Sequence, residues 1–127
     1  MILVDTSALI DSLTGPRRSA PRLRAFIEEG ERLVVPTLVL YEWRRGPRLE
    51  EELAAQEALL PSRTSVVFGS DEAKLAADLY GVVPRPRGRE IDLAIAAHAI
   101  RLGAWLWTLN QEDFEDIPGL ALAPSGG

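Results

Sequence analysis

Short apolar segments alternate with longer amphipathic segments along this chain of 127 residues. The apolar segments lack the apolar–polar alternation of a strand with one face in water, so each strand must be covered on both faces. Strands that alternate with helices in this way predict an α/β fold, with helices on both sides of a mostly parallel central sheet. The expected strands are Ile2–Val4, Arg32–Val35, Ser65–Phe68, Trp105–Trp107 and Leu120–Leu122.

Helical periodicity and capping residues place helices between these strands. We expect Thr37 and Ser70 to be N-caps, and we expect Gly81 to end the helix that follows Ser70. The expected helices are Ser7–Leu13, Ala20–Glu29, Leu38–Arg45, Leu49–Leu60, Asp71–Tyr80 and Glu90–Leu102, with one further helical turn at Gln111–Glu115.

The length suits one domain that spans residues 1–127, with a core at 1–123 and a flexible tail at 124–127. The absence of cysteine excludes a disulfide framework and a thiolate metal site. The longest apolar stretch, Leu33–Tyr41, is too short to cross a membrane. Because the first strand begins at Ile2, we expect no signal peptide, and we expect a cytoplasmic protein.

Polar residues follow three of the expected strands at their carboxyl ends, where parallel sheets bind ligands. Asp5 comes directly after the first strand, and Glu42 lies one turn into the helix after the second. Asn110 and Asp113 follow the strand at Trp105–Trp107. Asp92 lies apart from these, in the first turn of the helix at Glu90–Leu102.

Each of the three acids Asp5, Glu42 and Asp92 also has a purely structural interpretation. Asp5 could cap the helix that follows it, by accepting from free N–H groups. Glu42 could form an ion pair with Arg45 or Arg22. Asp92 could simply be an anion that the helix dipole favours.

The interpretation changes if the three acids meet in space. Each pair of carboxylates about 5 Å apart repels by roughly 3 kcal/mol at an effective dielectric constant near 20, so protons or a cation must compensate the charge. Oxygen ligands without cysteine or clustered histidine indicate Mg²⁺ or Mn²⁺. Such an ion usually takes further ligands from phosphate, which indicates phosphodiester hydrolysis.

Four segments of the chain carry a resemblance to a known family. They are MILVDTSALID at 1–11, PTLVLYEWRRG at 36–46, EIDLAIAAHAIRLG at 90–103 and TLNQEDFEDIPGL at 108–120. In this order they resemble PIN domains, and most closely the VapC-type toxin ribonucleases of bacterial and archaeal toxin–antitoxin pairs. The resemblance implies a three-layer α/β/α fold and a Mg²⁺- or Mn²⁺-dependent endoribonuclease that acts on RNA. It also implies a homodimer that a cognate antitoxin inhibits.

The resemblance assigns roles residue by residue. Asp5, Glu42 and Asp92 match the acids that hold the metal ion, and Thr6 matches the hydroxyl residue that supports the ion or its water. Asn110 and Asp113 match the last acidic segment and complete the pocket, although many relatives have Asp where this chain has Asn110. The spacing leaves open which of these two side chains faces the ion.

The neutral Asn110 supports a second hypothesis, in which a weakened PIN-like domain binds RNA or protein without cutting. A third hypothesis is a phosphoacceptor domain, which would need a lysine near a strand end. The only lysine, Lys74, falls on a polar helix face, which argues against that function.

The net charge of −5 excludes a general electrostatic attraction for RNA, so phosphate contacts must be local. The candidates are Arg17, Arg18, Arg85, Arg87 and Arg89. They have an alternative interpretation as solvated loop residues or as contacts to an antitoxin.

The single histidine and the tryptophans are expected to be structural. His98 shares a helix face with Ile95 and not with Asp92, which predicts a packed histidine and not a general base. Trp43, Trp105 and Trp107 are predicted to lie in the core or in a dimer interface and not to stack on bases.

Overall fold

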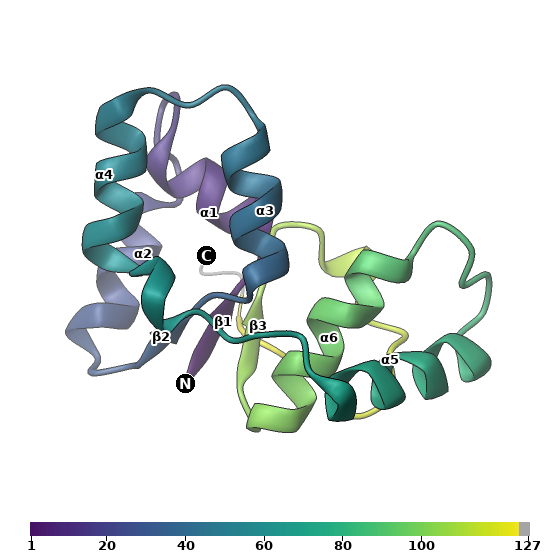
Figure 1. The fold of residues 1–127 in the computed structure, drawn as a ribbon. Coiled ribbons are helices and arrows are strands. Elements are labelled where there is room, and N and C mark those ends of the chain that lie inside the picture. The colour runs from purple at the N-terminus through teal and green to yellow at the C-terminus, as the bar shows by residue number, and fades with distance from the viewer. Residues whose placement is uncertain (125–127) are drawn as a thin grey trace.

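The central sheet of the computed structural model, which describes residues 1–124, holds four parallel strands among these residues (Figure 1). Their order is β2-β1-β3-β4, with β1 paired to both β2 and β3. The predicted parallel sheet is thus confirmed. The strands are β1 (Ile2–Val4), β2 (Leu33–Val34), β3 (Trp105–Trp107) and β4 (Ala121–Leu122).

Helices cover the sheet and give the expected three-layer α/β/α arrangement. Figure 1 shows α1 to α4 grouped at one end of the molecule and α5 with α6 at the other, with β1 and β3 between the two groups. The helices are α1 (Thr6–Leu13), α2 (Ala20–Glu28), α3 (Thr37–Arg45), α4 (Glu50–Leu59), α5 (Ser70–Val82) and α6 (Glu90–Leu102). Two 3₁₀ turns are η1 (Ser62–Thr64) and η2 (Gln111–Asp113).

The strand expected at Ser65–Phe68 is wrong, because this segment forms a single bridge between Val66 and Pro36. Val66 donates its N–H to the Val35 carbonyl, and Thr37 donates to the Val66 carbonyl, at 3.0 Å each. The chain turns into α3 at Thr37, so no extended residue follows Pro36 to pair with the next residues of the segment. The ladder therefore stops after one rung.

The ends of α3 and α5 also differ from the prediction. Thr37 and Ser70 are the first residues of their helices and not the caps, which are Pro36 and Gly69. Gly81 lies inside α5, which continues to Val82. A glycine lowers helix stability by only about 1 kcal/mol, so packing against α6 carries the helix past it. Of the predicted tail, residues 125–127 lie outside the described residues.

The core is built from β1, β3 and the inward faces of the helices. Trp43 and Trp107 are fully buried, and the Trp107 ring meets the Phe26 ring edge-on at 5.2 Å. Trp105, two residues before Trp107, remains half-exposed at 49%. Trp43 and Trp107 are therefore core residues, as predicted.

His98 is buried and meets the Phe68 ring edge-on at 5.7 Å. Burial lowers the pKa of His98, since a charged imidazole is poorly solvated there. The prediction of a packed structural histidine is confirmed. Among the described residues, no helix is both long and apolar enough to cross a membrane.

Replacing Trp107 by Ala should lower the free energy of unfolding by about 3–5 kcal/mol, because it empties a fully buried site. Trp105→Ala is the matched control on the same strand, with an expected loss of at most about 1 kcal/mol because its ring is half-exposed. Urea denaturation measures both. Equal losses in the two variants would contradict the described packing.

Candidate active site

The register of β1 against β3 brings Asp5 next to Thr108. Val4 pairs with Trp107, and the Asp5 N–H donates to the Trp107 carbonyl at 2.9 Å. Asp5 and Thr108 are therefore the first residues beyond the carboxyl ends of two neighbouring strands. The Thr108 hydroxyl donates to Oδ2 of Asp5 at 2.7 Å.

Asp5 is a buried carboxylate held by hydroxyl groups. Ser7 Oγ donates to the same Asp5 oxygen at 3.1 Å. Burial raises the pKa of Asp5, the hydrogen bonds from Thr108 and Ser7 oppose that shift, and the negative charge of Glu42 adds to it. Although Asp5 is the N-cap residue of α1, within residues 1–124 its side chain makes no capping hydrogen bond. The capping interpretation is therefore wrong.

Glu42 projects from α3 toward the start of α1. Its Oε1 accepts a hydrogen bond from the Thr6 hydroxyl at 2.6 Å. Arg45 lies 3.8 Å from its Oε2, so the ion pair foreseen with Arg45 is present at long range. The other foreseen partner, Arg22, lies instead over the Phe26 ring at 4.2 Å.

The pKa of Asp92 shows that the negative charges of the other acids act on this residue. It is half-buried in the first turn of α6, and burial together with the negative charges of Asp5, Asp113 and Glu42 raises its pKa to about 6. The positive charge of Arg89 acts in the opposite direction. We call Asp5, Glu42, Asp92 and Asp113 the acidic cluster, because their charges act on one another.

Asn110 and Asp113 belong to η2 and its start, directly beyond β3. Both line a hollow of about 570 Å³ together with Thr108. The Asn110 N–H donates to the Thr108 hydroxyl at 3.0 Å, so Thr108 connects this loop to Asp5. Asp113 is the one member of the acidic cluster that lines this hollow.

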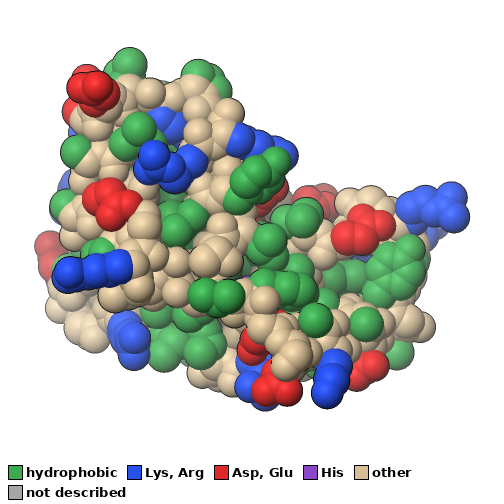
Figure 2. Space-filling view, in the orientation of Figure 1, with side chains coloured by type: hydrophobic (Ala, Val, Ile, Leu, Met, Phe, Trp, Pro, Cys, Tyr) green, Lys and Arg blue, Asp and Glu red, His purple; other side chains and the backbone are tan. Residues whose placement is uncertain are grey.

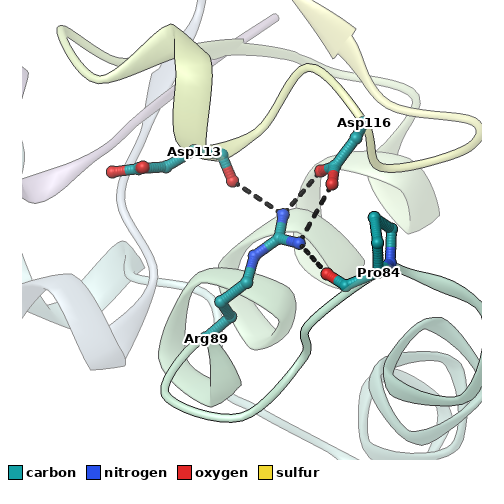
Figure 3. Close-up of polar contacts among 4 residues, drawn as sticks. All are labelled: Pro84, Arg89, Asp113 and Asp116. Atoms are coloured by element: carbon teal, nitrogen blue, oxygen red, sulfur yellow. Dashed lines mark hydrogen bonds and ion pairs between the residues drawn. The ribbon is translucent and has the colours of Figure 1, made fainter.

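The arginines foreseen as phosphate contacts have different environments. Arg17 and Arg18 are exposed between α1 and α2, and Arg85 and Arg87 are exposed between α5 and α6. Arg89 is instead engaged within the protein, where it bonds to Pro84, Asp113 and Asp116 (Figure 3). On the face drawn in Figure 2, basic side chains are scattered among acidic and hydrophobic ones.

The sequence interpretation missed Thr108, Ser7 and the intramolecular role of Arg89. Thr108 follows its strand as Asp5 follows β1, so strand pairing alone would have placed the two together. Arg89 carried no comparable signal, because its partner Asp116 lies 27 positions away in a loop.

The donor set of the acidic cluster fits a hard divalent cation, since it offers carboxylate oxygens with hydroxyl groups around them. Within residues 1–124, however, no three acidic or histidine side chains lie close enough together to hold an ion as they stand. The carboxylates are near enough to repel one another and still stand apart.

Comparison with known proteins gives concordant matches. The family model described as PIN domain matches residues 2–120. Ribonuclease VapC19 of Mycobacterium tuberculosis is 34% identical over 125 residues, which cover 94% of this chain and 97% of the relative. A toxin–antitoxin complex from Klebsiella pneumoniae contains a chain with 25% identity and a TM-score of 0.73, over 95% of this chain and 96% of that one. VapBC2 from Rickettsia felis, bound to a DNA fragment from its promoter, shares the fold at 20% identity, with a TM-score of 0.72 over 97% and 98% of the two chains.

Replacing Asp92 by Asn should stabilise the protein at pH 8 in EDTA. The pKa of Asp92 is raised from 3.8 to about 6, so the folded protein binds more protons than the unfolded chain between these values. The free energy of unfolding therefore falls as the pH rises through this window. Solvent screening of the half-buried group leaves an expected gain of about 1–2 kcal/mol at pH 8.

Urea denaturation at pH 8 and at pH 3.5 measures this effect, because the gain should vanish where the carboxyl group is protonated in both states. Glu90→Gln is the matched control, in the same first turn of α6 but exposed. A gain of equal size at both pH values, or in the Glu90 variant, would show that charge repulsion at Asp92 is not the cause.

Proposed function

The chain belongs to the PIN domain family, and from that membership we propose that it is an endoribonuclease, the toxin of a VapBC-type toxin–antitoxin pair. We further propose that hydrolysis of the RNA phosphodiester bond depends on Mg²⁺ or Mn²⁺. The observation that carries the proposal is the electrostatic coupling of Asp92 to Asp5, Asp113 and Glu42, acids from separate parts of the chain. Such repulsion costs the fold stability, and pKa values perturbed in this way cluster at functional sites.

Asp5, Glu42 and Asp92 would hold the divalent ion. When bound, such an ion neutralises charge at a phosphodiester and lowers the pKa of a coordinated water. The three acids come from the end of β1, from α3 and from the start of α6, so the fold and not one local motif sets their spacing.

Neighbouring hydroxyl groups orient these carboxylates. Thr108 and Ser7 both donate to Oδ2 of Asp5 and so hold this carboxylate in one orientation. Thr6 donates to Oε1 of Glu42, so its proposed role is to fix a carboxylate. Fixed ligand orientation reduces the reorganisation that substrate binding requires.

Asn110 and Asp113 would complete the pocket from the hollow beside Thr108. The negative charge of Asp113 acts on Asp92, whereas Asn110 offers a neutral amide that can accept from water or donate to a phosphate oxygen. His98 is packed in the core, so the proton of the attacking water would pass to a carboxylate or to solvent.

RNA binding would rely on local positive charge, because the acidic cluster repels phosphate. The exposed arginines Arg17, Arg18, Arg85 and Arg87 are the proposed phosphate contacts. The further proposed partners are a second copy of the chain, as a homodimer, and a cognate antitoxin, since solved structures with this fold include toxin–antitoxin complexes. The proposed compartment is the cytoplasm.

Asp5→Asn should lower the rate of RNA cleavage roughly 100-fold or more, because it removes a charge at the proposed ion site. The assay uses purified protein, single-stranded and structured RNA, and Mn²⁺ or Mg²⁺, with EDTA as the metal-free arm. Asp78→Asn is the matched control, because Asp78 is exposed on α5 away from the cluster. Cleavage that survives in the Asp5 variant would reject the mechanism. RNA binding by the unmodified protein with no metal-dependent cleavage would favour a non-cutting binding module, as the neutral Asn110 suggests.

The double variant Arg85→Gln/Arg87→Gln should weaken RNA binding in EDTA about equally for all sequences. Each lost phosphate contact should reduce the dependence of log K on log salt by about 0.7 for single-stranded RNA. Fluorescence anisotropy between 50 and 200 mM salt gives this slope. An unchanged slope would place the RNA elsewhere.

A further inference from the structure

We propose that Arg89 is a positioning residue, which ties the loop that carries Asp113 to the start of α6 and so fixes Asp113 relative to Asp92. This inference rests on the proposed nuclease function. It differs from the phosphate-contact role that the sequence suggests for Arg89, and the two roles predict different kinetics.

The guanidinium of Arg89 bonds to three residues, Pro84, Asp113 and Asp116, which lie in two loops (Figure 3). Its Nη1 donates to the Pro84 carbonyl at 2.9 Å and to Oδ2 of Asp116 at 3.0 Å. Its Nη2 donates to the Asp113 carbonyl at 3.0 Å and to Oδ1 of Asp116 at 2.6 Å. The loop before α6 and the loop after β3 are thereby held together at one point.

These four bonds use the hydrogen-bonding capacity of both terminal nitrogens, each of which carries two hydrogens. A phosphate oxygen at either terminal nitrogen would have to displace one of these acceptors, so only the N–H of Nε remains for another ligand. Arg89 is also the least exposed arginine of its loop, with 19% of its side chain accessible. Its neighbours Arg85 and Arg87 are free of this constraint, so they are better suited to bind RNA.

The contact to Asp113 leaves its carboxylate free. Arg89 bonds to the main-chain oxygen of Asp113, and Figure 3 shows the Asp113 side chain pointing away from the guanidinium. The bidentate ion pair is made instead with Asp116, which lies outside the acidic cluster. Arg89 thus fixes the backbone at Asp113 without neutralising the carboxylate that faces Asp92.

The position of Arg89 in the sequence explains how it acts on both acids. It is the N-cap residue of α6, three positions before Asp92, so its backbone is part of the helix start that carries Asp92. The side chain lines a hollow of about 390 Å³ together with Asp113 and Asp116. It bonds the helix start that carries Asp92 directly to the main chain at Asp113.

The test compares Arg89→Gln, Asp116→Asn and the double variant in steady-state RNA cleavage with Mn²⁺. Each single variant should lower kcat roughly 10- to 100-fold, since misplacement of a functional group by about 1 Å costs up to that much. The double variant should be no slower than the slower single variant, because both remove the same tie. KM, and RNA affinity in EDTA, should change less than about twofold. Arg89→Lys should not restore kcat, because an ammonium lacks the bidentate fork.

Arg101→Gln is the matched control, since Arg101 lies on the same helix and bridges Asp71 and Glu72 at 3.1 Å each, away from the acidic cluster. Its kcat should equal that of the unmodified protein. Hydrogen exchange provides a readout that does not require activity. The amides of residues 113–117 should exchange faster in the Arg89 and Asp116 variants than in the Arg101 variant.

Two results would overturn the inference. In the first, Arg89→Gln binds RNA more weakly in EDTA and shows a smaller dependence of log K on log salt, while Asp116→Asn behaves as the unmodified protein. This result would identify Arg89 as a phosphate contact. In the second, the Asp116 variant shows an unchanged kcat or unchanged hydrogen exchange at the amides of residues 113–117. The Asp116 variant provides this test even if Arg89→Gln does not fold. Failure of the unmodified protein to cleave RNA would reject the proposed function alone, and hydrogen exchange would still decide whether the tie exists.

Discussion

The parallel pairing of β1 with β3 determines where the candidate site can form. Because Val4 lies opposite Trp107, the chain leaves both strands at the same level of the sheet. Asp5 and Thr108 then meet through a 2.7 Å hydrogen bond. A shift of one residue in this register would turn both side chains toward opposite faces and separate them. Glu42 is contributed by α3, which follows β2, and Asp92 by α6, which precedes β3, while Asp113 comes from η2 after β3.

The acidic cluster shows how the fold tolerates charges that oppose its own stability. Hydroxyl groups of Thr108, Ser7 and Thr6 stabilise the carboxylates of Asp5 and Glu42 without neutralising them. Arg89 supplies a positive charge nearby, while its hydrogen bonds go to Asp116 and to carbonyl groups. The pKa values of Asp5 and Asp92 nevertheless stay raised, because burial and the neighbouring negative charges outweigh these favourable contacts.

Much of the fold, and part of the site, followed from local patterns in the sequence. Apolar runs and capping residues located β1, β3 and α6 closely, because strong periodicity reports burial directly. The segment at 65–68 failed because strand formation there depends on a partner that ends at Pro36, which is a non-local condition. Asp5 and Asp92 were identified by type and position relative to strands and helices. Arg89 escaped detection because its function depends on a loop contact that no spacing encodes.

The two outer strands of the sheet contain only two residues each, β2 at Leu33–Val34 and β4 at Ala121–Leu122. A border this short presents almost no unpaired main-chain groups, so it gives an incoming extended peptide little to bind. Edge-to-edge pairing between the sheets of two copies of the protein is disfavoured for the same reason. Contacts with another chain are therefore left to surfaces outside the sheet edges, where side chains and not the backbone determine the partner.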